Sequence, residues 1–407
     1  MIILIIVALI LLALLIMIIV LSLIYTPKYV ARILVWGLGG GGAQITDHLK
    51  FLDHKMENAL PTFYFKKSLN EELVTSNFNK INLIEDLDQF LKTTKTTAFI
   101  VIQNDTILYE KYFNAHTRES IETSFSCAKS FASALVGIAV DEGFIKNVND
   151  PITDYIPELK ERDIKFESIT VKHLLQMSSG IKYKEAWFIH GDNAKTYYVP
   201  DLRRLALEKT KIVGKPMQYF LYNNYHPLLI GIILERATGR SVANYLQDKI
   251  WKSLGMEFEG SWSIDSKRSN FEKMESGINA RAIDFAKFGK LFLNNGMWGE
   301  KQIISEKWVK ESTSIDKSLD YDTFYRDLEN IDELHAQHFE SGKTYYKYFW
   351  WGYTREDNKF DFCARGNHGQ YIYICPDKNL IIVRHGKDFG IEIGDWPNIF
   401  YDFATIF

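Results

Sequence analysis

The chain has 407 residues and nearly balanced charge, with 48 Lys and Arg against 51 Asp and Glu and a formal net charge of −3. Hydrophobic residues make up 46% and charged residues 24%, which is typical of a folded globular protein and not of a disordered one. This balance, without a long basic run, argues against nucleic acid as a partner. Three scattered cysteines without a CxxC pair give neither a disulfide framework nor a zinc signature, and we expect no metal and no cofactor.

The first 25 residues form an uncharged apolar run in which Ser22 and Tyr25 are the only polar side chains. As a helix rising about 1.5 Å per residue, this run exceeds the roughly 30 Å hydrocarbon core of a bilayer. A cleaved signal peptide is the alternative, but its usual basic start and small-residue cleavage site are not visible. We therefore expect residues 1–25 to be a single-pass transmembrane anchor. Lys28 and Arg32 follow the span, which by the positive-inside rule favours a cytoplasmic C-terminal part.

A glycine-rich stretch at residues 37–42 satisfies the pattern GxGxxG. A dinucleotide site also needs a strand, a helix and an acidic residue that closes the next strand. Here the next apolar run, residues 63–65, is followed by two lysines. We therefore interpret the stretch as a flexible juxtamembrane linker, and we divide the chain into an anchor, a linker with an N-terminal extension, and a globular domain, at residues 1–25, 26–84 and 85–407.

Two strand hairpins near the ends of the globular part frame a long helical region. Residues 98–102 and 107–113 form one hairpin, and residues 371–375 and 380–384 form the other. Between them, apolar spacings of 3 and 4 predict helices over residues 126–142, 171–177, 202–209, 227–238, 242–254 and 281–293. We expect an α+β fold in which an antiparallel sheet is assembled from both ends of the chain, is flanked by helices, and stands beside an all-helical subdomain.

The pattern Ser-x-x-Lys occurs three times, beginning at Ser126, Ser179 and Ser314, whereas the signatures of α/β-hydrolases, zinc proteases, Walker loops and EF-hands are absent. A tetrapeptide this loose also arises by coincidence, and context separates the three. Gly180 follows Ser179 and breaks the helix that a Ser–Lys pair needs. Ser314 lies in a polar stretch. Only Ser126 opens a helix with an apolar face.

On that helix, Lys129 lies one turn after Ser126, so its side chain is expected to reach the Ser126 hydroxyl. Burial of Lys129 would lower its pKa and let it accept a proton. The backbone N–H of Ser126, at a helix N-terminus, would face a developing oxyanion. A surface lysine is the alternative interpretation of Lys129.

The pattern Tyr-x-Asn occurs twice. Residues 112–114 end a strand and are interpreted as structural, whereas Tyr222 and Asn224 lie in a loop before the helix expected from residue 227. A tyrosine near an ammonium group can shuttle a proton, and an amide such as that of Asn224 can hold a substrate carbonyl. An aromatic core residue is the alternative for Tyr222.

Three motifs of this chain resemble, in order and spacing, those of serine β-lactamase-like hydrolases. They are Ser-x-x-Lys at 126–129, Phe-x-Tyr-x-Asn at 220–224 and a glycine-rich strand entry at 366–370. That family includes class C β-lactamases, DD-peptidases, family VIII esterases and 6-aminohexanoate-oligomer hydrolases. The resemblance covers residues 85–407 and implies the β-lactamase/transpeptidase-like fold. It also implies that Ser126 is the acylated nucleophile, that Lys129 and Tyr222 share general acid and base work, and that Asn224 contacts the substrate.

The chain departs from β-lactamases at their third motif, because no Lys-Ser/Thr-Gly tripeptide occurs. The strand entry contains Gly366, Asn367 and His368, as in the esterase and oligomer-amide hydrolase members. We expect these residues to bind substrate, with Asn367 supplying the second oxyanion N–H. Without a permanent cation at this entry we expect weak or no β-lactamase activity, since a histidine is mostly neutral near pH 7.

The resulting hypothesis is a membrane-anchored serine hydrolase that cleaves a small-molecule ester or amide through an acyl-enzyme on Ser126. The alternative is an inactive scaffold or a protein that binds peptidoglycan fragments. Relatives mostly work outside the cytoplasm, which implies an extracytoplasmic catalytic domain and conflicts with the charge bias around the anchor. The sequence indicates no oligomeric state.

Overall fold

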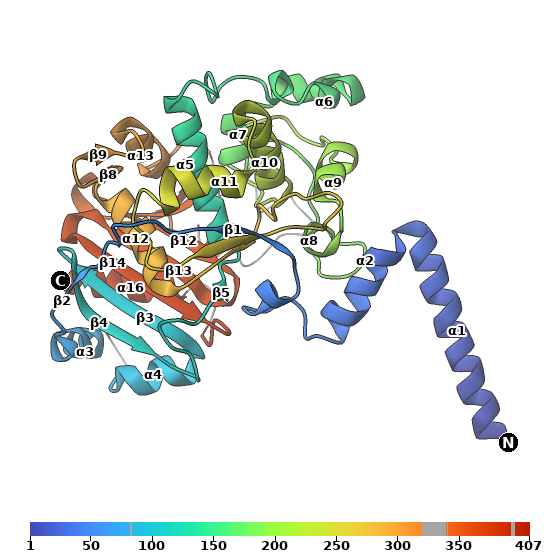
Figure 1. Ribbon diagram of the computed structural model, residues 1–407, viewed down its shortest axis with the longest axis horizontal. Coiled ribbons are helices and arrows are strands. Elements are labelled where there is room, and N and C mark those ends of the chain that lie inside the picture. The colour runs from blue at the N-terminus through green and yellow to red at the C-terminus, as the bar shows by residue number, and fades with distance from the viewer. Residues whose placement is uncertain (82–83, 320–338, 340, 392–394) are drawn as a thin grey trace.

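An eight-stranded sheet is assembled from both ends of the chain in the computed structural model, which describes residues 1–407 apart from 82–83, 320–338, 340 and 392–394 (Figure 1). All neighbouring strands are antiparallel except β2 and β4, which are parallel. Ile100, from the first predicted hairpin, pairs with Val383, from the second, so the predicted assembly is confirmed. The strand order is β10 (Thr344–Lys347), β11 (Trp350–Thr354), β12 (Phe360–Gly366), β13 (Gln370–Cys375), β14 (Leu380–Gly386), β3 (Thr96–Gln103), β4 (Thr106–Tyr112) and β2 (Lys66–Lys67).

Helices cover both faces of this sheet, which explains why β13 is buried at every position. On one face, Gly289 of α12 (Ala282–Leu293) lets the helix approach Ile372, where an added Cβ would lie 2.9 Å from a methyl carbon. On the other face, the Phe400 ring contacts that of Tyr371 at 5.7 Å. Because neighbouring residues of a strand point to opposite faces, these contacts define three layers. The first face also carries α5 (Cys127–Asp141), and the second carries α3 (Glu71–Lys80), α4 (Leu87–Thr93) and α16 (Asp395–Ile406).

A helical subdomain lies beside the sheet, as the periodicity predicts (Figure 1). Its central helix, α10 (Tyr225–Thr238), is almost completely buried and ends at Gly239, whose φ of 68° suits glycine. It packs against α5, α7 (Val171–Leu175) and α9 (Leu202–Lys209). The predicted helix over 242–254 divides into α11 (Val242–Leu246) and the π-helical turn η5 (Gln247–Trp251). The remaining elements of the subdomain are η3 (Ile152–Asp154), α6 (Pro157–Arg162), η4 (Ile164–Ser168) and α8 (Asp192–Tyr198). Three short elements follow α12 in the chain: β8 (Met297–Trp298), β9 (Lys301–Gln302) and α13 (Glu306–Thr313).

A second, four-stranded sheet connects the N-terminal extension to the start of α5. Its order is β1 (Asp53–Met56), β6 (Gly260–Ser263), β7 (Ile278–Ala280) and β5 (Glu122–Thr123). Strand β5 ends three residues before Ser126, and the loop from β6 to β7 carries Glu275. This sheet therefore brings three distant parts of the chain to one place.

The N-terminal segment packs onto the domain through Tyr29 and Arg32, which are both buried. After α1 (Ile2–Ile24), the chain forms α2 (Pro27–Arg32), the π-helical turn η1 (Ile33–Leu38) and the short turn η2 (Asp47–Leu49). Arg32 donates to the Tyr198 carbonyl at 3.0 Å and to the Asp265 carbonyl at 2.6 Å. The glycine pattern begins inside the π-helical turn η1 and does not follow a strand, which agrees with rejecting a dinucleotide site. The interpretation of the glycine stretch as a linker stays a prediction: Gly39, Gly40 and Gly41 are exposed, whereas Ile33 and Ala43 on either side are buried.

Candidate active site

A sharp turn from strand to helix presents Ser126. It is the N-cap residue of α5, and Phe125 before it has a φ of 46°, a left-handed conformation that is costly for a bulky side chain. The Phe125 ring is fixed by contacts with the rings of Tyr197 and His368, at centroid distances of 6.5 and 5.1 Å. Ser126 makes no side-chain capping bond, and it lies at the positive end of the helix dipole.

Lys129 is buried beside Ser126, with 1% of its surface exposed. Its Nζ donates to the Ser126 Oγ at 2.7 Å and to the Glu275 carbonyl at 3.1 Å. Burial lowers the pKa of Lys129 from 10.5 to about 7, and the nearby Glu275 and Glu185 carboxylates oppose this shift. A substantial fraction of the amine is therefore neutral at physiological pH and able to accept the Ser126 proton. This burial excludes the alternative interpretation of Lys129 as a surface lysine.

Tyr222 completes the group from the loop before α10. The Lys129 Nζ lies 4.8 Å from the centre of its ring. Burial raises the pKa of Tyr222 above its ordinary value, although a hydrogen bond with the Ser126 side chain lowers it in part. The phenol thus remains protonated at neutral pH, which suits a proton donor. Its ring is held against Trp351, with centroids 5.5 Å apart.

Ser126 and Tyr222 line a pocket of about 270 Å³, whereas Lys129 is buried behind Ser126 and is not part of the lining. Asn224, the N-cap of α10, lines it too, and its Nδ2 donates to the Tyr183 hydroxyl at 2.9 Å. The Asn224 Oδ1 is buried and has no hydrogen-bond partner among the described residues. The amide therefore offers an acceptor to a ligand N–H more readily than a donor to a carbonyl. The other lining residues are Phe125, Glu185, Trp187, Asn193, Tyr197, Glu275, Ser276, Trp351, Arg365, Gly366, Asn367 and Phe389.

The end of β12 also lines the pocket, with Arg365 and Gly366. A Cβ on Gly366 would lie 2.4 Å from the Ser124 carbonyl oxygen, so only glycine lets this strand approach the turn that carries Ser126. Asn367 follows in the pocket lining. The His368 ring is not part of that lining, because its Nε2 lies 2.9 Å from the Ala43 carbonyl of the N-terminal segment.

Sequence reasoning missed three charged residues in the pocket lining, Arg365, Glu185 and Glu275. Arg365, directly before Gly366, lines the pocket with its guanidinium 5.2 Å from the centre of the Trp351 ring. A permanent cation therefore lines the pocket directly before the strand entry, where sequence reasoning considered none. Glu185 lines the pocket from a loop, and desolvation raises the pKa of its carboxyl, which accepts from the Asn193 Nδ2 at 2.9 Å.

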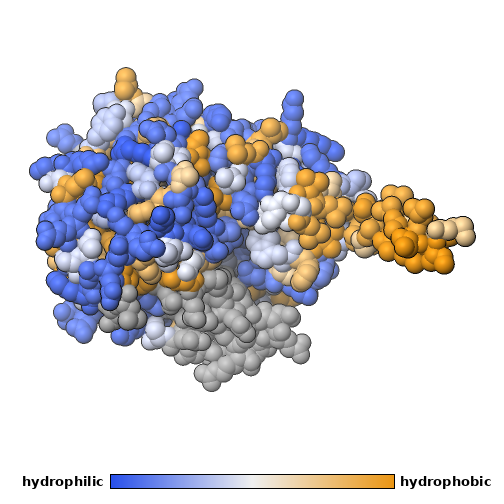
Figure 2. Space-filling model, turned by 90° about the horizontal axis from the view of Figure 1, so that it is seen from below, coloured by the Kyte–Doolittle hydropathy of each residue, from blue (hydrophilic) through white to orange (hydrophobic). Residues whose placement is uncertain are grey.

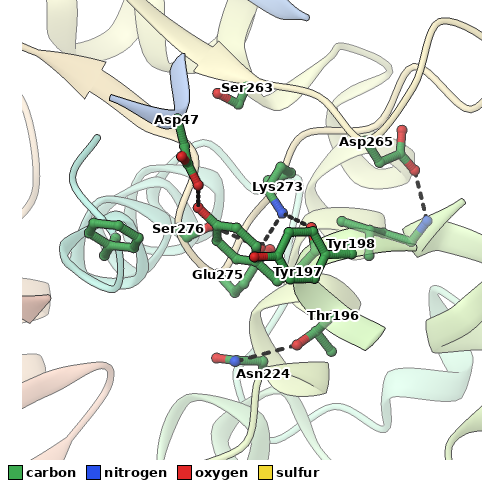
Figure 3. A network of polar contacts seen from close by, with 12 residues as sticks. Asp47, Thr196, Tyr197, Tyr198, Asn224, Ser263, Asp265, Lys273, Glu275 and Ser276 are labelled. Carbon is green, nitrogen blue, oxygen red and sulfur yellow. Dashed lines mark hydrogen bonds and ion pairs between the residues drawn. The ribbon is translucent and has the colours of Figure 1, made fainter. Parts of the chain in front are cut away.

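A buried polar network that includes Glu275 adjoins the site (Figure 3). Lys273 donates to the Glu275 carboxylate and to the Tyr197 carbonyl, both at 2.8 Å. The Tyr197 hydroxyl donates to Asp47 of the N-terminal segment at 2.5 Å. The carbonyl of the same Glu275 accepts a hydrogen bond from Lys129, so the network helps to fix the position of the Lys129 amine.

The other two Ser-x-x-Lys sequences do not form such pairs. The Ser179 hydroxyl is buried 2.6 Å from the His226 Nε2, and Lys182 is exposed. The Ser314 hydroxyl accepts from Lys347, on β10, at 3.1 Å.

Comparison with known proteins identifies the family. The model named Beta-lactamase matches residues 84–391. The chain belongs to this family. Proteins named as hydrolases are similar to this chain in sequence. The 6-aminohexanoate-dimer hydrolase of Paenarthrobacter ureafaciens is 25% identical over 330 residues, which cover 77% of this chain and 76% of that protein. The teichoic acid D-alanine hydrolase of Staphylococcus aureus (strain MRSA252) is 29% identical over 161 residues, 39% of this chain and 37% of that protein.

Solved structures share the fold. One from Bacillus anthracis, with the provisional description 6-aminohexanoate-dimer hydrolase, superposes with a TM-score of 0.73 and 24% identity, over 88% of this chain and 92% of that one. A class C beta-lactamase superposes with a TM-score of 0.59 and 15% identity, over 83% of this chain and 97% of that one. The predicted β-lactamase/transpeptidase-like fold is thus confirmed, and the family supports a hydrolase.

Proposed function

We propose that this protein is a serine hydrolase that cleaves an amide or ester through an acyl-enzyme on Ser126. The observation that carries the proposal is the 2.7 Å contact between the Ser126 Oγ and a buried Lys129 whose pKa is about 7. A lysine held charged on the surface would not activate a hydroxyl, and an inactive scaffold has no need to bury an amine beside one.

In the proposed acylation, neutral Lys129 takes the Ser126 proton as the Oγ attacks the substrate carbonyl carbon. The backbone N–H groups of Ser126 and Asn367 stabilise the oxyanion. The C–N or C–O bond then breaks, and Tyr222 gives its proton to the leaving nitrogen or oxygen and regains one from the Lys129 ammonium. Water attacks the acyl-enzyme in the second half, with the same groups in reversed roles. The carboxamide of Asn224 and the strand entry orient the substrate.

The test compares serine variants of the full-length protein. Ser126→Ala should lose hydrolysis of p-nitrophenyl butyrate by several orders of magnitude, because the nucleophile and its proton path are removed together. Ser314→Ala is the matched control, since it lies in the same tetrapeptide pattern outside the pocket, and it should keep wild-type kcat/KM. Ser179→Ala should keep it as well. Full activity of the Ser126 variant would contradict the proposal and favour the scaffold alternative.

We further propose that α1 is retained as a membrane anchor. Its 23 residues have a mean hydropathy of 3.8 in the most apolar window and none is buried against the body. Membranes washed with alkaline carbonate should keep the protein, and its intact mass should include the first 25 residues. A mass that begins after residue 25 would show a signal peptide instead. Protease added to intact cells tests the extracytoplasmic placement, which predicts digestion of the catalytic domain.

A further inference from the structure

Large apolar side chains are exposed on the N-terminal segment and on the loop that joins this segment to the pocket. We call Val35, Leu38, Trp187 and Phe188 the apolar rim; their exposed fractions are 62%, 78%, 50% and 75%. Figure 2 shows hydrophobic side chains on the body beside the point where α1 leaves it. Exposed aromatic and aliphatic side chains gathered at one place indicate a binding surface, because their contact with water is unfavourable.

The rim is attached to the chain directly after α1. The Tyr29 hydroxyl donates to the Ile189 carbonyl at 2.7 Å, which ties the loop of residues 182–191 to α2. Ile189 also packs in one apolar cluster with Tyr25 and Trp36. Tyr29 lies five positions after Ile24, so its backbone is within about 17 Å of the end of α1, at about 3.4 Å per residue. The loop lies at the end of the Tyr29 side chain.

The rim also borders the active-site pocket. Trp187 lines the pocket, and its ring contacts that of Tyr197 at a centroid distance of 5.8 Å. Tryptophan is enriched where proteins meet the membrane–water interface, since its ring is apolar and its N–H is polar. Lys182 and Lys184 are exposed on the same loop and suit anionic headgroups.

From this arrangement, and building on the hydrolase and anchor proposed above, we propose that the apolar rim rests on the phospholipid bilayer that holds α1. The mouth of the pocket then opens into the headgroup layer. The substrate is accordingly an amphiphile retained in the membrane, whose amide or ester lies near the lipid headgroups. A hydrolase that acts on freely diffusing molecules does not need an exposed apolar rim beside its pocket.

The first experiment measures depth directly and needs no activity. Phe188→Cys and Leu38→Cys, each labelled with the fluorophore NBD in the full-length protein, are placed in phosphatidylcholine–phosphatidylglycerol vesicles that contain doxyl-labelled lipid. The three native cysteines are buried and stay unlabelled. Both labels should lose most of their fluorescence. The control is Ile164→Cys, 60% exposed on η4, which should lose little. Equal quenching at all three positions would overturn the proposal, and shielding without lipid quenching would indicate a second copy or another protein.

The second experiment asks whether the contact serves catalysis. The double variant Phe188→Ser, Leu38→Ser leaves every residue of the pocket lining in place, so turnover of soluble p-nitrophenyl acetate should not change. Turnover of a long-chain ester embedded in vesicles should fall about tenfold, since two exposed apolar side chains no longer enter the interface. Ile164→Ser should change neither rate. Loss of both rates in the double variant would contradict an interfacial role, and absence of activity in the wild type would contradict the hydrolase proposal while leaving the quenching result valid.

Discussion

Lys129 and Tyr222 lie side by side, and burial shifts their pKa values in opposite directions. Desolvation lowers the pKa of the amine to about 7 and raises that of the phenol. For the amine the charged form is disfavoured, and for the phenol the anion is disfavoured. One group is thus ready to accept a proton and the other to donate one, which is how two titratable groups divide acid and base work.

The rate should therefore depend on pH through Lys129. Because the neutral amine is the active form, kcat/KM for p-nitrophenyl butyrate should rise with pH and level off above a midpoint near the lysine pKa of about 7. Initial rates over a pH series at low substrate concentration give this profile. A profile that is flat across neutral pH would mean that Lys129 does not activate Ser126.

Stability should respond to the same residue with a defined sign. The folded-state pKa of Lys129, about 7, lies below its ordinary value of 10.5. The buried ammonium therefore destabilises the folded protein fully at acidic pH, and the destabilisation is relieved as pH rises between these values. Lys129→Met should raise Tm more at about pH 6 than at about pH 9. Equal shifts in Tm at the two pH values would contradict the lowered pKa.

Arg365 should control selection of acidic substrates. We compare p-nitrophenyl butyrate with the p-nitrophenyl monoester of glutaric acid, which differs by a terminal carboxylate. A charge-assisted hydrogen bond contributes about 1.5–3 kcal/mol, so Arg365→Gln should lower kcat/KM for the acidic ester about tenfold or more relative to the neutral one. Equal losses for the two esters would mean that the guanidinium does not reach the substrate. The expectation of weak β-lactamase activity depends on the same residue.

Among the elements, the contact between β12 and the turn before α5 limits the geometry of the site most closely. Gly366→Ala would push a methyl group against the Ser124 carbonyl oxygen, from a starting distance of 2.4 Å, and should move Ser126 relative to Asn367. We expect at least a tenfold loss of kcat/KM, because displacements of about 1 Å in a catalytic geometry are that costly. Gly37→Ala, where a Cβ meets nothing within 4 Å, is the control and should retain activity. Unchanged kinetics in the Gly366 variant would show that the strand is free to shift.

The elements that sequence predicts well are those set by local spacing. The Ser126–Lys129 pair and the helix α10 follow from residues close together in the chain, and the turn of residues 104–105 marks the first hairpin. What the sequence cannot indicate arises from long-range packing. Arg365 enters the pocket because Gly366 beside it allows a close approach, and His368 turns toward Ala43, 325 positions away. The packing of the N-terminal segment has the same origin.

At the scale of the whole molecule, the N-terminal segment links the proposed anchor to the proposed active site. Asp47 accepts from Tyr197, whose carbonyl holds Lys273, and Lys273 pairs with the residue whose carbonyl contacts Lys129. A single set of buried contacts thus runs from the chain after α1 to the proposed base. This arrangement agrees with an enzyme whose catalytic domain is held in a fixed orientation at the membrane.

The central claim is that Ser126 carries the acyl group. A fluorophosphonate probe reacts covalently with an activated serine, and proteolysis followed by mass spectrometry locates the adduct. The account predicts a single adduct on Ser126 in the wild type, strongly reduced labelling in Lys129→Met and none in Ser126→Ala. An adduct on another serine, or a folded wild-type protein that remains unlabelled, would contradict it.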